Sequence, residues 1–159
     1  MNKQVIIKEV GLNDFQAVHE LIMQVHKLHV IKRKDVYKDV DPMNFEEFKT
    51  ELLNSNNIYL VAEFENKIVG ICFSQIKEIS DNRILKNNKI LHIQNLCVDK
   101  NYQKKGIGKK LYNAVVQVAK EKSVDSIELI VWGFNKNAIK FYQNLGMNIK
   151  NLKFEQKIQ

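Results

Sequence analysis

Apolar residues recur along this chain with two periods, one typical of helices and one typical of strands. Helical spacing predicts a first helix that is capped by Asn13 and Gln16 and runs to about His29. A second helix is predicted to begin at Asn44, because Glu47 follows three residues later as in a capping box. Two more helices are predicted in the second half of the chain.

Runs rich in β-branched and aromatic residues predict strands that alternate with these helices. The second and third runs are separated only by Glu65, Asn66 and Lys67, which is typical of a hairpin. This order of elements indicates an α/β (α+β) fold. The runs comprise residues 5–10, 58–64, 68–76, 89–99, 126–132 and 152–158.

The strand that precedes a pair of glycines changes phase in its middle. Leu91 and Ile93 are apolar at odd positions, whereas Leu96 and Val98 are apolar at even positions. A β-bulge near Gln94 would produce this slip, because one extra residue returns the apolar side chains to the same face. The alternative interpretation is a strand buried on both faces.

The two glycines, Gly106 and Gly108, lie in a basic loop that leads into an amphipathic helix. The first N–H groups of a helix have no partner within it and carry the positive end of its dipole, so they attract anions. The mononucleotide loop GxxxxGK[ST] is absent, and the dinucleotide fingerprint GxGxxG fails at Leu111. We interpret the loop as a polyphosphate site, with a solvated tight turn as the alternative. The lysines around it stand at positions 100, 104, 105, 109 and 110.

Composition narrows the classes of function. The 159 residues fit one domain, and a formal charge of +7 favours polyanionic partners. The sequence has no apolar run long enough for a membrane helix and no secretory pattern at its N-terminus. Cys72 and Cys97 lack partners at metal-ligand spacing, and His26 and His29 lack a third ligand. We therefore expect a cytoplasmic protein without a membrane partner or a bound metal.

Residues 95–108 and 135–147 form two blocks that are separated by one helix and one strand. The first block is similar to the strand and the Gln/Arg-x-x-Gly-x-Gly/Ala loop of the GNAT superfamily of acyl-CoA-dependent N-acyltransferases. The second block is similar to that family's Asn-x-x-Ala…Tyr…Gly-Phe segment. The resemblance covers the chain from about Ile58 onward.

This resemblance implies a single-domain GNAT-like fold over residues 1–159. The mixed central sheet would have about six to seven strands, flanked by about four helices, with a β-bulge before the glycine-containing loop. Residues 1–57 would supply helices on the acceptor side, and residues 58–159 would form the acetyl-CoA-binding core.

The resemblance also implies that acetyl-CoA is the co-substrate. Asn135 would contact its pantetheine arm from one side, and Tyr142 would lie beside its sulfur. The backbone of Leu96, Cys97 and Val98 would pair with the arm from the other side. The pyrophosphate would be bound by Gln103, Lys104, Lys105, Gly106, Ile107, Gly108 and Lys109.

Acetyl transfer to an amine requires two proton movements. An alkylammonium is only about 0.1% neutral near pH 7.4, so a base or a water chain must remove its proton. The phenol of Tyr142 stays protonated at neutral pH and can protonate the departing thiolate, although a core tyrosine is the alternative interpretation. Relatives place a glutamate at the positions held here by Ile130 or Asn95. The remaining candidates for the base are His92, Glu63 and Glu128.

These features predict an acetyl-CoA-dependent N-acetyltransferase that works by direct transfer within a ternary complex. A catalytically silent acyl-CoA-binding sensor of the same fold is the alternative. Cys97 has no sequence-adjacent histidine to support an acetyl-enzyme. Only Tyr102 and Tyr112 flank the lysines, so a nucleic acid partner is not expected.

The acceptor is expected to be a primary amine on a small molecule, a peptide or a protein. It would be recognised by the first two helices and by the polar loop of residues 32–42 between them. Trp132 is expected to pack internally or to line the cleft. The resemblance leaves a homodimer open. Residues that could face the acceptor are His26, His29, Tyr37, Asp39 and Asp41.

Overall fold

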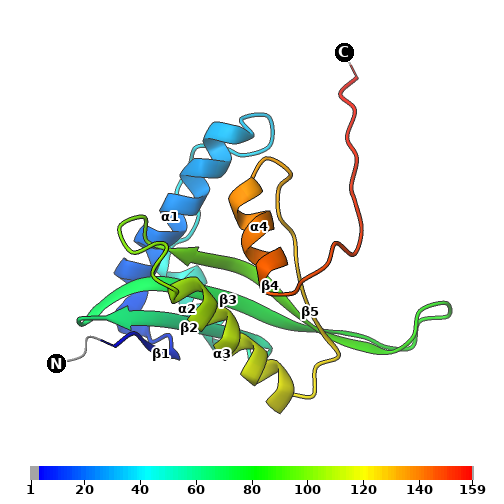
Figure 1. Cartoon of the computed structure of the whole chain (residues 1–159), viewed down its shortest axis with the longest axis horizontal. Helices are drawn as coiled ribbons and strands as arrows, with labels where there is room; N and C mark the ends of the chain where they lie inside the picture. The colour runs from blue at the N-terminus through cyan, green and yellow to red at the C-terminus, as the bar shows by residue number, and fades with distance from the viewer. Residues whose placement is uncertain (1–3, 159) are drawn as a thin grey trace.

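A five-stranded mixed sheet divides the molecule into two helical layers (Figure 1). The computed structural model describes residues 4–158. The strands lie in chain order, the first four antiparallel and the last parallel to its neighbour. They are β1 (Ile6–Glu9), β2 (Asn57–Phe64), β3 (Lys67–Ile79), β4 (Asn88–Val98) and β5 (Ser126–Leu129).

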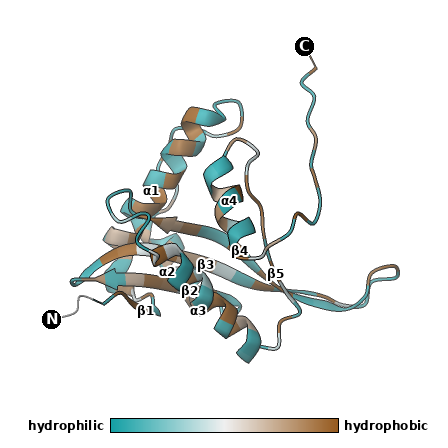
Figure 2. Ribbon diagram, in the orientation of Figure 1, coloured by the Kyte–Doolittle hydropathy of each residue, from teal (hydrophilic) through white to brown (hydrophobic). Residues whose placement is uncertain are grey.

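The helices cover both faces of this sheet, along whose central strands apolar residues concentrate (Figure 2). On one face, α1 (Phe15–Lys32) and α2 (Phe45–Leu53) enclose a core that includes Val18, Phe48 and Cys97. On the other face, α3 (Ile107–Glu121) encloses a core that includes Cys72 and Leu91. The last helix, α4 (Lys136–Asn144), packs against the start of α3. Within residues 4–158, no helix combines the length and the apolar character needed to cross a bilayer.

The turn and one of the two helix caps predicted from the sequence are present in the structure, and the other cap is not. Glu65 and Asn66 form the predicted hairpin turn with φ angles of 51° and 61°. Asn44 caps α2, and its side chain accepts a hydrogen bond from the Glu47 N–H at 2.9 Å. The capping box expected at Asn13 is wrong, because a short 3-10 turn, η1 (Leu12–Asp14), precedes α1. Asp14 instead accepts a hydrogen bond from the Gly11 N–H.

The sheet has five strands among the described residues, fewer than the six to seven expected. Residues 152–158 alternate as predicted but form no strand, because they have no hydrogen-bonded neighbour. Alternation of apolar and polar residues gives a segment one apolar and one polar face. The segment becomes a strand only when its backbone pairs with that of another strand. The strand expected over residues 126–132 ends at Leu129 for the same reason, since β4 pairs with it only up to Ile93.

Candidate active site

β4 contains the bulge that its sequence predicts. Phe73 of β3 pairs with Asn95 and the next residue, Ser74, pairs with Ile93, so Gln94 is the extra residue. Because of the bulge, the apolar residues on both sides of it face α3, and Leu91, Ile93 and Leu96 belong to the same core. The phase slip is therefore a true bulge, and the interpretation as a doubly buried strand is wrong.

Beyond the bulge, no strand among residues 4–158 pairs with one edge of β4, which we call the free edge. Its pairing with β5 stops at Ile93, whereas its pairing with β3 continues to Val98. The Asp99 N–H donates to the Val69 carbonyl on the β3 side at 2.9 Å. Because backbone groups alternate along a strand, Leu96 and Val98 direct their N–H and C=O groups to the free edge. An extended ligand can pair there as an added strand.

The loop after β4 turns through two left-handed residues, Lys104 with φ 59° and Gly106 with φ 78°. Gln103 fastens this loop to the strand, because its side-chain amide donates to the Val98 carbonyl at 3.0 Å. The first hydrogen bond within α3 runs from Lys110 N to Gly106 O. The N–H groups of residues 107–109 therefore have no carbonyl partner within the helix, and groups of this kind attract anions.

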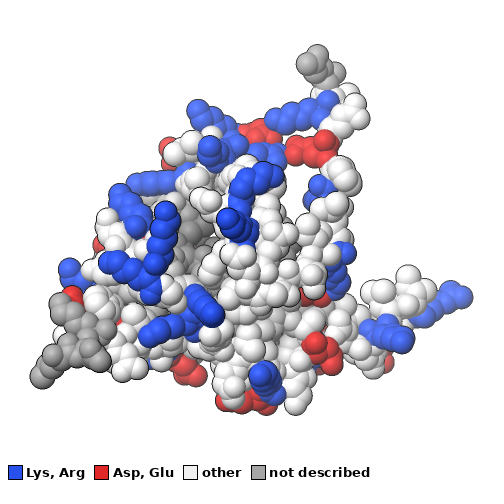
Figure 3. Space-filling model, in the orientation of Figure 1, with Lys and Arg blue, Asp and Glu red and all other residues white. Residues whose placement is uncertain are grey.

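The surroundings of this loop are strongly basic. Figure 3 shows Lys and Arg side chains gathered on the face that carries the loop and the N-terminal ends of α3 and α4. Asp99 is the nearby acid, and its charge is already engaged: it accepts from the Asn101 N–H at 2.8 Å and from Gln24 Nε2 at 3.1 Å. These bonds, led by that of Asn101, lower the pKa of Asp99. Asp99 is thus bound by neighbouring groups of the protein, and the positive charge of the lysines around the loop can attract an anionic ligand.

The two glycines serve different purposes. A Cβ placed on Gly106 would meet nothing within 4 Å, so this corner is open toward a ligand. A Cβ on Gly108 would lie 3.2 Å from the Phe141 ring and 3.7 Å from Leu96. Gly108 therefore lets α4 pack closely against α3, and this contact brings the two sequence blocks together.

Tyr142 follows Phe141 on α4 and is half-buried. Among the described residues its hydroxyl has no hydrogen-bond partner. Burial raises its pKa well above the usual value for a phenol, with smaller contributions from Cys72 and Tyr112. The phenol therefore keeps its proton at any physiological pH, and its hydroxyl is not engaged by another described residue.

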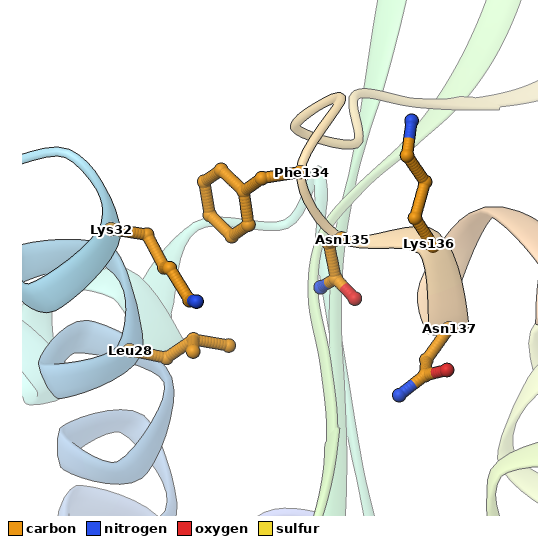
Figure 4. A pocket seen from close by; sticks show the side chains of 6 residues that line it. All are labelled: Leu28, Lys32, Phe134, Asn135, Lys136 and Asn137. Carbon is orange, nitrogen blue, oxygen red and sulfur yellow. The ribbon is translucent and has the colours of Figure 1, made fainter.

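Asn135 caps α4 and borders a pocket. Its Oδ1 accepts a hydrogen bond from the Ala138 N–H at 3.1 Å, which explains its place before the helix without any ligand. The rest of the amide faces a pocket of about 240 Å³ between α1 and α4 (Figure 4). The pocket is lined by Leu28, Lys32, Phe134, Asn135, Lys136 and Asn137.

Next to this pocket, side chains from distant parts of the chain form an aromatic cluster, defined as His29, Tyr37, Trp132 and Phe134. The Trp132 indole N–H donates to the Tyr37 hydroxyl at 2.9 Å, and the His29 ring stacks on Tyr37. Arg33, at the end of α1, lies 4.5 Å from the centre of the Trp132 ring. Sequence reasoning named three of the four aromatic-cluster residues but missed Phe134 and Arg33, for which no local pattern gives a signal.

The candidate bases occupy different environments. Glu63 lies on β2, with β3 between it and β4, and forms an ion pair with Lys8. Glu128 forms an ion pair with Lys150. His92 is half-buried on β4, and burial, followed by the charge of Lys77, lowers its pKa. His92 is therefore neutral near pH 7 and able to accept a proton.

Cys97 is poorly suited to carry an acetyl group. Its thiol is buried and lies 3.6 Å from the Leu21 carbonyl of α1. Burial, assisted by the charge of Asp99, raises its pKa to about 12. Since the thiolate is the nucleophilic form, this environment suppresses its reactivity. Within the described part of the chain, no group of three or more His, Cys, Asp or Glu residues is arranged to hold a metal.

Comparisons with known proteins identify N-acetyltransferases as relatives of this chain. An uncharacterized N-acetyltransferase of Methanocaldococcus jannaschii is 30% identical over 105 residues, which cover 66% of this chain and 45% of that protein. L-ornithine N5-acetyltransferase of Arabidopsis thaliana is 36% identical over 58 residues, which cover 36% of this chain and 25% of that protein. The chain thus spans less than half the length of these two curated relatives.

Two crystal structures show how far the fold extends. A mutant of the BH1408 protein from Bacillus halodurans superposes with a TM-score of 0.94 at 29% identity, covering 97% of this chain and 99% of that one. The aminoglycoside N-acetyltransferase AAC(6')-Iy in complex with CoA shares the fold, with a TM-score of 0.79 at 14% identity and coverage of 99% and 97%. Residues 20–147 match the family model described as the Acetyltransferase (GNAT) family. The chain belongs to the GNAT family of acetyltransferases.

Proposed function

We propose that this protein is an acetyl-CoA-dependent N-acetyltransferase that transfers an acetyl group directly to a primary amine. The observation that carries the proposal is the free edge of β4 at Leu96 and Val98, which leads straight to the N–H groups of residues 107–109 at the start of α3. A strand-like arm that ends in a diphosphate fits this combination. The names of the relatives support the same activity.

The donor would lie along β4 and the loop. Residues 103–109 would hold the pyrophosphate through backbone N–H groups and lysines. The N–H and C=O groups of Leu96 and the N–H group of Val98 would pair with the pantetheine arm, because Gln103 already occupies the Val98 carbonyl. The Cys97 backbone faces β3 and its side chain faces α1. Asn135 would contact the arm through the amide nitrogen that the helix cap leaves free.

Direct transfer needs one bond to form and one to break. The amine nitrogen attacks the thioester carbonyl, the carbon–sulfur bond breaks, and Tyr142 gives its proton to the departing thiolate. Tyr142 then recovers a proton from solvent. Glu63 and Glu128 already form ion pairs, so His92 is the candidate that remains to receive the amine proton through water. The buried Cys97 thiol argues against an acetyl-enzyme.

The acceptor would be bound from the side of residues 1–57, next to the aromatic cluster. One relative is named for ornithine, and fold neighbours include an aminoglycoside acetyltransferase and a glucosamine-6-phosphate N-acetyltransferase. We therefore propose a primary amine on a small molecule or a peptide as the acceptor. The basic face would serve the cofactor, and we propose a cytoplasmic site of action, where acetyl-CoA is available.

The test combines binding and turnover. Calorimetry with CoA and acetyl-CoA should show binding to the folded protein, and a thiol-release screen across polyamines, amino acids, amino sugars, aminoglycosides and peptides should find an acceptor. Absence of CoA binding would contradict the proposal. Tight binding with no thiol release across the panel would favour the alternative, a catalytically silent acyl-CoA sensor.

A further inference from the structure

Arg33 follows α1 and lies beside the pocket between α1 and α4. The preceding residue, Lys32, lines that pocket, and the Arg33 guanidinium lies 4.5 Å from the centre of the Trp132 ring. Trp132 stacks on Phe134, which also lines the pocket. The Arg33 side chain is 18% exposed, so its neighbours fix its position while solvent still reaches it. Arg33 is therefore a cation at the edge of the proposed acceptor site.

Two carboxylates share the Arg33 guanidinium unequally. Asp35 binds along one edge, where it accepts hydrogen bonds from Nε at 3.0 Å and from Nη2 at 2.9 Å. The two oxygens of Glu155 accept at 3.0 Å and 2.9 Å, but both bonds come from Nη2. Nη1 has no hydrogen-bond partner among the described residues. Because a guanidinium binds a carboxylate best through two nitrogens in parallel, Glu155 leaves the edge formed by Nη1 and Nη2 half used.

The C-terminal tail that carries Glu155, residues 148–158, is held by side chains alone. It leaves α4 as an extended chain, and among residues 4–158 its backbone forms no hydrogen bond to any backbone group (Figure 1). Its large apolar side chains are exposed, Phe154 by 88%, so little burial holds the tail in place. Each of its ion pairs includes a side chain that is more than half exposed, and such pairs are weak. They join Lys150 to Glu128, Glu155 to Arg33 and Lys157 to Asp35.

The mouth of the pocket is cationic once Glu155 is set aside. Lys32 and Lys136 line the pocket, and no acidic residue is among its described lining. In Figure 4 the Lys32 side chain extends from α1 into the pocket. Asp35 offsets the charge of Arg33 and orients its guanidinium, so the two lysines are an excess of positive charge. This arrangement attracts an anionic group, and the half-used edge of Arg33 has the geometry for a carboxylate.

We propose that Arg33 recognises a carboxylate on the acceptor, and that Glu155 occupies the guanidinium until the acceptor displaces it. The inference rests on the proposed acetyltransferase function and specifies its acceptors as amino acids or peptides that carry a free carboxylate. The acceptor carboxylate would bind the edge formed by Nη1 and Nη2, while Asp35 keeps the guanidinium in place. The tail would thus be a competitor that belongs to the same chain.

The position of Tyr142 indicates which amine of such an acceptor reacts. Tyr142 follows Lys136 by six residues on α4, which is roughly 9 Å along the helix axis. An acceptor that binds Arg33 at the mouth of the pocket must therefore extend toward Tyr142. An amine at the far end of a side chain suits this separation better than an α-amine does, so lysine is a suitable probe.

Binding is measured through the fluorescence of Trp132, the single tryptophan of the chain, whose ring contacts Arg33. The probes are L-lysine and L-lysinamide, which differ in the charge of the carboxyl group, and each is titrated with and without CoA. L-lysine should bind at least about 10-fold more tightly, as expected for a hydrogen bond to a charged group. Arg33→Gln should abolish this preference. The control is Arg83→Gln, in the loop after β3, which should retain it.

Glu155→Gln tests the competition by the tail. It should tighten the binding of L-lysine about threefold and leave that of L-lysinamide unchanged, because only a carboxylate competes with Glu155 for Arg33. The Glu155 side chain is 53% exposed, so this variant should fold like the native protein. Lys153→Gln, which removes another charge from the tail, is the control and should alter neither affinity. In a thiol-release assay, Glu155→Gln should lower the KM for L-lysine with kcat nearly unchanged.

Three outcomes would overturn the inference. They are equal affinities of the native protein for the two probes, a preference that survives Arg33→Gln, and an affinity for L-lysine that Glu155→Gln leaves unchanged. The proposed function fails in a different way, when CoA does not bind or when no acceptor releases thiol. Because the fluorescence titration requires no turnover, the two failures are distinguishable.

Discussion

Around the glycine-containing loop the site is built from backbone groups, whereas around Trp132 it is built from side chains. The first region offers the N–H groups of residues 107–109 and the free edge at Leu96 and Val98. The second depends on contacts such as that between Trp132 and Tyr37, which are 95 positions apart in sequence. Backbone groups are the same in every sequence, so the first region can bind one cofactor whatever side chains it carries. We therefore expect the second region to determine which acceptor is bound.

The largest expected effect is on kcat, without a matching effect on acetyl-CoA binding. Tyr142→Phe removes the proposed proton donor and should lower kcat by about 10²-fold to 10⁴-fold with the acetyl-CoA dissociation constant nearly unchanged. The control is Tyr112→Phe, which removes another partly buried phenol from α3 and should change kcat little. Steady-state kinetics and calorimetry measure both. Equal kcat in native and Tyr142→Phe protein would remove Tyr142 from the mechanism.

A second prediction compares the two faces of the sheet at alkaline pH. Burial raises the pKa of Cys72, on the α3 face, and that of Cys97, on the α1 face, from 9.0 to about 12. Stability that depends on the protonated thiols is complete below pH 9 and is lost as the pH rises toward 12, because the unfolded chain releases these protons first. At pH 10 each thiol should lower the free energy of unfolding by about 1 kcal/mol.

Urea denaturation at pH 8 and at pH 10 measures this loss. Cys72→Ala and Cys97→Ala should each remove about half of the cysteine contribution to the difference between the two pH values, whatever their effect on stability at pH 8. If one variant has the same difference in unfolding free energy between pH 8 and pH 10 as the native protein, the thiol that it lacks is solvated. Its face of the sheet is then less tightly packed than described.

A third prediction tests the backbone-built region. Gly106→Ala places a methyl group in the open corner and should weaken acetyl-CoA binding by about 30-fold, equivalent to the loss of one hydrogen bond to a charged group. Gly146→Ala is the matched control, because Gly146 also has a positive φ, 91°, and open space around it. Both variants should lose about 1 to 2 kcal/mol of stability from backbone strain, but only the first should lose affinity. Equal affinities in calorimetry would disprove the phosphate site.

The smallest expected effect concerns the side-chain-built region. Tyr37→Phe removes the hydroxyl that accepts the Trp132 hydrogen bond and should raise the acceptor KM by about fivefold, without changing the KM for acetyl-CoA. Tyr59→Phe, which breaks a hydrogen bond to Glu51, is the control. A change in the acetyl-CoA KM alone would show that the aromatic cluster serves the cofactor.

The same contrast explains what the sequence could predict. The bulge at Gln94 and the hairpin at Glu65 and Asn66 are short-range features, so their patterns lie within a few residues and both predictions are confirmed. The pairing of Arg33 with Glu155 joins residues 122 positions apart and has no local pattern. Residues 152–158 have the alternation of a strand, but whether they form one depends on a neighbouring strand to pair with, which the alternation does not specify.

The free half of β4 has one more consequence, for solubility. An open strand with apolar neighbours ordinarily invites other chains to stack on it and aggregate. Here five lysines, at positions 100, 104, 105, 109 and 110, follow this strand in the loop and at the start of α3, so like-charged protein surfaces are repelled while a polyanion is attracted. The charges that favour the ligand thus also act as gatekeepers, and we expect the protein to become more prone to precipitation when salt screens them and no ligand is present.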